Sequence, residues 1–249
     1  MHFLIFSYVR YTWYSLIDAA VIQSEQDMKI KWYGHACFRI EGEGIAIVTD
    51  PYTPEVAGLD PVDEPADVVV MSSATDRFHS NASMVPGDPK ILNALEIASR
   101  GLVEVNGVTF EALPTMESLE YKESPDENAI YRFELEGISI LHLGDLGNPL
   151  TEDQLARLRG RADVLLALTG GPPTIELEDL DRAIEEIGPR IVIPMHYQIP
   201  KLKLDILPLE AFTSRYPEDV VTRVGTTTFE LNSSALPQTP RIYVLEPAG

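Results

Sequence analysis

The chain has 249 residues, of which 45% are hydrophobic and 23% charged, as expected for a globular protein with enough apolar residues for a sizeable core. Its formal net charge of −20 argues against a nucleic-acid or anionic-membrane partner. The single cysteine, Cys37, excludes an internal disulfide framework and a cysteine-rich zinc site, and it fits a reducing cytoplasm.

Residues 1–27 differ in composition from the rest of the chain. They are apolar and rich in aromatic residues, contain no glycine or proline, and are interrupted by Arg10. The segment lacks the basic start and cleavage site of a signal peptide and is too interrupted for a membrane span. It is either a helical extension or the product of an upstream start. We prefer a working start at Met28, because a regular strand pattern begins there, and we expect a single domain over residues 28–249.

The first half of the domain is predicted to be rich in β-strands. Asn106-Gly107 between two apolar runs predicts a hairpin. Ile91, Leu92 and Leu95 share a helical face, which predicts a helix over residues 89–99. The strands are expected at residues 29–33, 37–41, 44–49, 68–71, 102–105 and 108–113.

The second half alternates strands with helices. Thr151 and Gln154 form a capping-box pattern for a helix that ends near Leu158. Further helices are predicted over residues 176–187 and 209–216. The strands are expected at residues 129–135, 138–143, 162–168, 191–195, 220–224, 226–231 and 241–245. This order predicts an α/β protein whose helices pack outside its sheets.

Three buried strands are each followed by a polar side chain with metal-binding or catalytic chemistry. Residues 68–71 lead into a loop that contains Asp76, residues 138–143 precede Asp145, and residues 191–195 precede His196. Because site residues are often mounted where a strand opens into a loop, we expect these three side chains to converge.

Four short motifs occur in one order along residues 28–249. They are WYGHACF at 32–38, TDPY at 49–52, HLGDLG at 142–147 and IPMHY at 193–197. With them the chain resembles the metallo-β-lactamase superfamily, and within it the branch of L-ascorbate-6-phosphate lactonase-like hydrolases. The resemblance implies a four-layer αβ/βα sandwich, a metal site at one sheet edge and hydrolase activity.

The chain departs from the ligand motif of that family. The family pattern H-x-H-x-D-H reads SSATDR at residues 72–77, so only Asp76 is retained. A further family histidine falls at Glu117, or in an alternative register at Met116. The resemblance therefore leaves the first metal position with Ser72, Ala74, Glu117 and Asp145, and alanine cannot bind a metal. We expect this position to be lost.

The second metal position leaves two alternatives. Asp76, Asp145 and His196 could hold one divalent ion, with zinc, manganese or iron suited to such a ligand set and with Asp76 and His196 as the catalytic residues. Alternatively, the guanidinium of Arg77 lies between Asp76 and Asp145 and replaces the metal. We favour this metal-free arrangement.

Other side chains near the motifs have weaker assignments. His79 either replaces a lost ligand through a small shift of the loop or is an exposed loop histidine, and we favour the exposed position. His35 is either a motif residue near the site or a histidine bonded to the backbone. Asp50 is expected to support the site loop through hydrogen bonds, and Tyr197 either lines a pocket or packs in the core. His142 should point away from Asp145 and have a structural role.

The functional prediction is a hydrolase of at most one metal, with water as nucleophile and an ester, lactone or phosphoester as substrate, and with weakened activity. The alternative is an inactive relative that binds a small ligand or a partner. A metal-free enzyme with His196 as general base and Arg77 holding an anionic substrate is a third hypothesis. Assembly into a homo-oligomer is common in such families.

Overall fold

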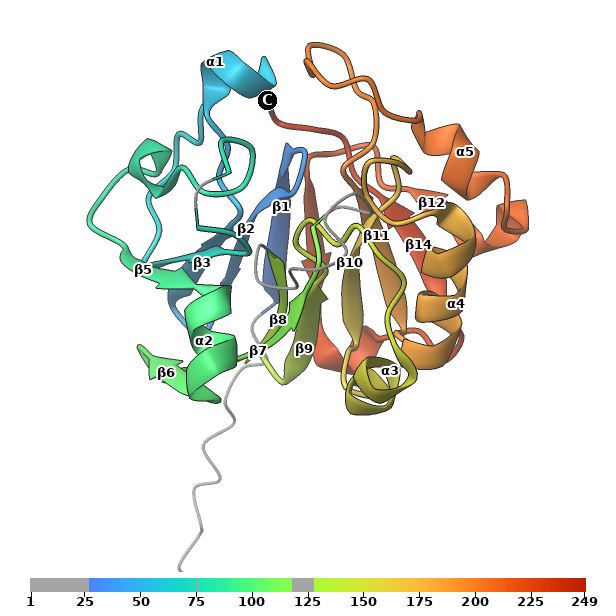
Figure 1. Ribbon diagram of the computed structural model, residues 1–249, viewed down its shortest axis with the longest axis horizontal. Helices are drawn as coiled ribbons and strands as arrows, with labels where there is room; N and C mark the ends of the chain where they lie inside the picture. Colours follow the sequence, from blue (N-terminus) through green and yellow to red (C-terminus); the bar gives the residue numbers. More distant parts are fainter. Residues whose placement is uncertain (1–26, 75, 118–127) are drawn as a thin grey trace, which may run out of the picture.

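Two β-sheets face each other in the computed structural model of the protein (Figure 1), which describes residues 27–74, 76–117 and 128–249. The prediction about residues 1–27 therefore lies outside the described residues, except for Asp27. Cys37 is fully buried in the core. The two sheets and few helices confirm the predicted α/β fold.

The first sheet has six strands. The three neighbouring pairs from β13 to β3 are antiparallel, and the two pairs from β3 to β5 are parallel. Its spatial order is β13 (Thr228–Leu231), β1 (Met28–Gly34), β2 (Cys37–Gly42), β3 (Ile45–Thr49), β4 (Val68–Met71) and β5 (Lys90–Asn93).

The second sheet has eight strands, and its central strands β9, β10 and β11 are buried at every residue, as continuous apolar runs predict. From β12 to β9 the neighbours are parallel, and from β9 to β6 they are antiparallel. Its spatial order is β12 (Val221–Arg223), β14 (Arg241–Val244), β11 (Ile191–Met195), β10 (Val164–Leu168), β9 (Ile138–His142), β8 (Asn128–Leu135), β7 (Val108–Thr115) and β6 (Val103–Val105).

The helices are short, and α3, α4 and α5 lie on the outer side of the eight-stranded sheet (Figure 1). The predicted capping box of Thr151 and Gln154 is present at the start of α3. None of the helices in the described part of the chain is long and apolar enough to cross a membrane. The helices are α1 (Pro54–Ala57), α2 (Ala94–Arg100), α3 (Glu152–Leu158), α4 (Leu177–Ile187) and α5 (Leu209–Thr213), with 3₁₀ turns η1 (Ala82–Met84), η2 (Glu218–Val220) and η3 (Ser233–Ala235).

The helix predicted over residues 89–99 is wrong in its first half. Lys90–Asn93 forms β5, which pairs in parallel with β4, and only Ala94–Arg100 is helical. Pairing with the open edge of β4 supplies hydrogen bonds that the local helical pattern does not reveal. Asn93 ends the strand and caps the helix, because its side chain accepts a hydrogen bond from the Leu95 amide.

The predicted convergence of strand ends is observed at one edge between the two sheets. The loop after β4 reaches the start of β8, where the Ala129 amide donates to the Ser72 carbonyl at 2.9 Å. The turn between β1 and β2 reaches His142 at the end of β9, whose Nε2 donates to the Ala36 carbonyl at 2.9 Å. These contacts fix the loops of one sheet against those of the other.

Candidate metal centre

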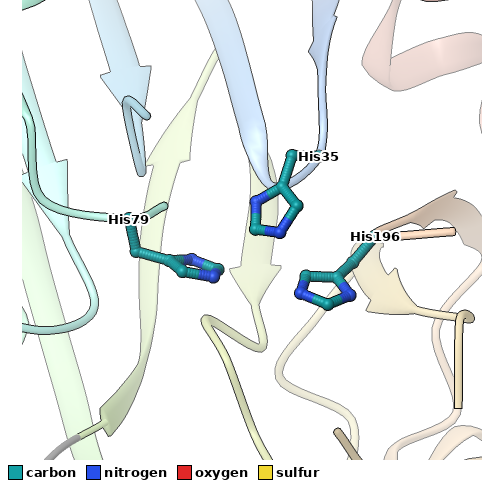
Figure 2. A group of neighbouring side chains, drawn as sticks. All are labelled: His35, His79 and His196. Carbon is teal, nitrogen blue, oxygen red and sulfur yellow. The ribbon is translucent and has the colours of Figure 1, made fainter. Parts of the chain in front are cut away.

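Five side chains with metal-ligating chemistry gather where the two sheets meet. Figure 2 shows the imidazoles of His35, His79 and His196 converging from three separate segments, with one ligand atom of each within 4.8 Å of the others. Asp76, His79 and Asp145 form a second group that meets the same distance limit. His79 belongs to both groups, so the five residues form one cluster.

His79 reaches the cluster because the loop after β4 turns back on itself. The Ser80 amide donates to the Asp76 carbonyl at 2.9 Å, and the Phe78 amide donates to Asp76 Oδ1 at 2.9 Å. The buried imidazole donates from Nδ1 to Asp50 Oδ2 at 3.0 Å. Its Nε2 then lies 3.6 Å from Asp76 Oδ2 and 3.5 Å from Asp145 Oδ2. These separations are long for hydrogen bonds but suit atoms that share one ion.

Arg77 does not lie between Asp76 and Asp145, so that prediction is wrong. Its side chain is exposed and forms no salt bridge with any residue that the structure describes. His79, predicted to be exposed, is fully buried instead. The tight turn at Asp76–Ser80 explains both errors, because it directs the side chain at 77 outward and the one at 79 inward.

His35 and His196 are held together by their backbones. The His196 amide donates to the His35 carbonyl at 3.1 Å, and Trp32 Nε1 donates to the same oxygen at 3.0 Å. Both histidines have positive φ, 51° for His35 and 53° for His196. Their ring centroids lie 4.1 Å apart. The His35 ring nitrogens have no hydrogen-bond partner among the described residues, so His35 is not the backbone-bonded histidine of the first interpretation.

Asp50 supports the site loop through hydrogen bonds, as predicted. The Ser72 amide and hydroxyl donate to its two carboxylate oxygens at 2.8 and 2.7 Å, and the Tyr131 hydroxyl donates at 3.2 Å. Burial alone would raise the pKa of Asp50, but the nearby His142 and the hydrogen bond from His79 lower it overall. Because the Ser72 hydroxyl is committed to Asp50 and Ala74 has no ligand atom, neither residue contributes to the cluster.

Three other predicted residues surround the cluster without forming its centre. His142 donates from Nε2 to Ala36 and accepts at Nδ1 from the Gly144 amide at 2.8 Å, in agreement with a structural role. Tyr197 is buried with its ring 5.1 Å from that of Trp32, which is the packing alternative. Glu117 lies beside Asp145. Burial raises the pKa of Asp145 to about 6, and a hydrogen bond between the Glu117 and Asp145 side chains partly offsets this rise.

The cluster contains buried polar atoms that no protein group satisfies, and their chemistry suits a bound cation. In the described part of the chain, five buried side-chain atoms lack hydrogen-bond partners, and all belong to this cluster. Buried polar groups are rarely left unpaired. The atoms are both ring nitrogens of His35, Nε2 of His79, Oδ1 of Asp145 and Nδ1 of His196. Imidazole nitrogens and carboxylate oxygens fit a divalent transition metal.

The histidines differ in protonation when no metal is present. Burial, with His196 and His79 nearby, holds the pKa of His35 well below its usual range. Burial and then His79 lower the pKa of His196 to about 3. Burial also disfavours charge on His79, but Asp145 and Asp50 raise its pKa to about 10. His35 and His196 therefore have free lone pairs, and the His79 imidazolium is the cation beside the two carboxylates.

Comparison with known proteins shows to which family the chain belongs. Residues 29–196 match the family described as the β-lactamase superfamily domain, which is more than half of the chain. The chain belongs to the metallo-β-lactamase superfamily. A UPF0173 protein of Pyrococcus furiosus is 32% identical over 183 residues, which cover 68% of this chain and 83% of the relative. A UPF0173 metal-dependent hydrolase of Methanoculleus marisnigri is 31% identical and covers 68% of this chain and 81% of the relative.

A solved structure of the superfamily has the same fold. It is a candidate Zn-dependent hydrolase of Thermotoga maritima, with a TM-score of 0.70 and 34% identity, covering 88% of this chain and 98% of the other. The sequence interpretation placed His35 near the site as one of two alternatives and gave His79 as a possible replacement ligand, but it favoured neither as a member of the cluster. One signal was available for His79, which lies three residues after Asp76, the spacing that places two side chains on one side of a helical turn.

Proposed function

We propose that this superfamily member is a metal-dependent hydrolase that uses one divalent ion, held by Asp76, His79, Asp145 and His196. The observation that carries the proposal is the group of buried atoms without hydrogen-bond partners, in residues whose ligand atoms lie within 4.8 Å of one another in two overlapping groups. The names of its relatives as metal-dependent hydrolases support it. When bound, such an ion polarises a carbonyl or phosphoryl group and acidifies water.

The chain's own residues prepare the centre for this role. Asp50 accepts the Nδ1 proton of His79 and thereby directs Nε2 at the two carboxylates. The side chains of Asp76 and Asp145 are 19% and 14% exposed, whereas those of His79 and His196 are 1% and 4% exposed. The carboxylate side is therefore the open side, from which substrate and water approach, and the histidine side is closed.

One ion rather than two is proposed because Ser72 and Ala74 give no ligand to a second position. A single ion must both polarise the substrate and activate water, so we expect lower activity than a two-metal centre gives. Esters, lactones and phosphoesters are the proposed substrates, in line with the resemblance to L-ascorbate-6-phosphate lactonase-like hydrolases. The second candidate, a ligand-binding protein without hydrolysis, is favoured by the same loss of ligands.

Elemental analysis and metal titration of the purified protein test the proposal. We expect one zinc, manganese or iron ion per chain, and hydrolysis of generic ester, lactone or phosphodiester substrates that stops when a chelator removes the ion. His79→Ala should lower metal affinity by roughly a hundredfold or more, because a ligand is lost. The matched control is Arg77→Ala in the same loop, which should bind metal normally.

Two results would contradict the proposal. Protein that takes up no ion at millimolar metal lacks the proposed centre. Protein that binds one ion but hydrolyses none of the three substrate types supports the ligand-binding candidate instead.

A further inference from the structure

We propose that His35 is a direct ligand of this ion, so that the centre presents three imidazole nitrogens, from His35, His79 and His196. The inference rests on the one-metal site proposed above and deepens it. It concerns a residue that the family ligand motif does not contain, and it determines which metals the centre prefers.

The position of His35 is that of a ligand. Its ring centroid lies 4.1 Å from that of His196 and 4.6 Å from that of His79. One nitrogen of each ring lies within 4.8 Å of the others (Figure 2). Two nitrogens bound to one ion at about 2.0–2.1 Å lie roughly 3–4 Å apart. The separations of at most 4.8 Å lie near this range, so the three nitrogens are placed to share one ion.

The hydrogen bonding of His35 leaves it no other role in the described structure. The imidazole is fully buried, and neither ring nitrogen has a partner there. His142 shows what a structural histidine looks like in the same chain, because one of its nitrogens donates to Ala36 and the other accepts from Gly144. A neutral imidazole needs one donor and one acceptor contact, and His35 has neither.

The backbone at His35 gives no reason for an imidazole. Its φ of 51° lies in the left-handed region, where glycine is the cheapest residue. The turn is instead fixed by the His35 carbonyl, which accepts hydrogen bonds from Trp32 and His196. These bonds need only the main chain. The side chain is thus held rigidly in a strained turn and directed into the cluster, a combination typical of functional sites.

A third imidazole changes the chemistry of the centre. Without His35, two carboxylates and two imidazoles form a mixed set that suits manganese as well as zinc, whereas a third imidazole shifts the preference towards zinc, cobalt, nickel and iron. His35 and His79 thereby supply the nitrogen ligands that Ser72 and Ala74 cannot. We expect the protein to prefer Zn²⁺ and Co²⁺ over Mn²⁺.

The test replaces His35 by glycine, which removes the imidazole while suiting the positive φ of the turn. Zinc, cobalt and manganese affinities are measured by calorimetry, and the visible spectrum of the Co²⁺ protein reports its ligand set. His35→Gly should lower Zn²⁺ affinity by roughly a hundredfold, lower Mn²⁺ affinity less, and change the Co²⁺ spectrum. Added imidazole, which can occupy the vacated space, should restore both affinity and spectrum.

Phe78→Leu is the matched control, because the Phe78 ring packs 5.5 Å from that of His35 but offers no ligand atom. It should leave the Co²⁺ spectrum unchanged. Equal losses in His35→Gly and Phe78→Leu, or a His35→Gly protein with the wild-type spectrum and affinity, would overturn the assignment. If the assignment is overturned but the wild-type protein binds one ion and hydrolyses substrate, the proposed function still holds. A His35-dependent spectrum without hydrolysis supports the ligand and refutes the function.

Discussion

Asp50 is the residue on which the position of His79 depends. Its buried carboxylate accepts hydrogen bonds from the amide and hydroxyl of Ser72, from the hydroxyl of Tyr131 and from Nδ1 of His79. The first two donors belong to the loop that has lost the family histidines. The Asp50 carboxylate thus accepts hydrogen bonds from the polar groups of Ser72 in the altered loop. It also orients His79, which replaces a lost histidine in the cluster.

Replacing Asp50 by asparagine removes the negative charge. It also places an NH₂ donor opposite one of the groups that now donate a hydrogen bond to the carboxylate. We expect the free energy of unfolding of the metal-free protein to fall by roughly 2–4 kcal/mol, because His79 loses its charged partner. Urea denaturation measures this change. Asp76→Asn is the control, since Asp76 is partly exposed and should matter less to stability. Equal stability of the Asp50→Asn and wild-type proteins would contradict this account.

At the scale of elements, the loop between β4 and η1 decides which side chain enters the site. Its Ser80 amide closes the turn on the Asp76 carbonyl, and the Asn81 amide anchors it to the Pro51 carbonyl at 2.8 Å. The Ser80 hydroxyl also donates to the Ser73 carbonyl at 2.8 Å. These bonds act together with the Phe78 amide bond to Asp76 Oδ1 to set the direction of the loop.

Ser80→Pro should lower zinc affinity at least about tenfold. Proline lacks the amide that closes the turn, and it restricts the backbone of the preceding His79, which lies within the turn. Ser80→Ala removes only the hydroxyl and should retain most of the affinity. Calorimetric zinc titration of both variants distinguishes these effects. The importance of the turn would be refuted by a Ser80→Pro protein that binds zinc as tightly as Ser80→Ala.

At the scale of the whole molecule, the candidate centre connects the two sheets. His35 lies in the turn between β1 and β2, and Asp76 and His79 follow β4 of the same sheet. Asp145 and His196 follow β9 and β11 of the other sheet. An ion held by both sets would link loops that are far apart in sequence and would stabilise the folded chain over the unfolded one.

Metal should therefore raise the melting temperature. At a free metal concentration a hundredfold above Kd, the expected gain is about 2.7 kcal/mol. For a chain of this size that corresponds to roughly 5–10 °C, which differential scanning fluorimetry can measure after chelation and reloading. The His79→Ala protein should show little shift under the same conditions. A wild-type melting temperature that does not change with metal would exclude a centre that links the sheets.

Most of the fold could be predicted because buried strands and amphipathic helices leave periodic patterns in the sequence. The apolar runs at β9, β10 and β11 and the capping box of α3 are local signals, and the structure confirms them. The error at β5 has a non-local cause. Ile91 is 53% exposed, so its apolar character did not indicate a helical core face. Only the neighbouring edge of β4 makes Lys90–Asn93 a strand.

The sequence by itself determined the family motifs, the loss of histidines at Ser72 and Ala74, and the retention of Asp76, Asp145 and His196. Only the tertiary structure decided that His79 enters the cluster, that Arg77 leaves it and that His35 joins it. The physical reason is that a ligand set depends on the direction of each side chain. That direction follows from turn hydrogen bonds and from contacts between the sheets, which link residues 35, 79 and 196 across more than a hundred positions of chain.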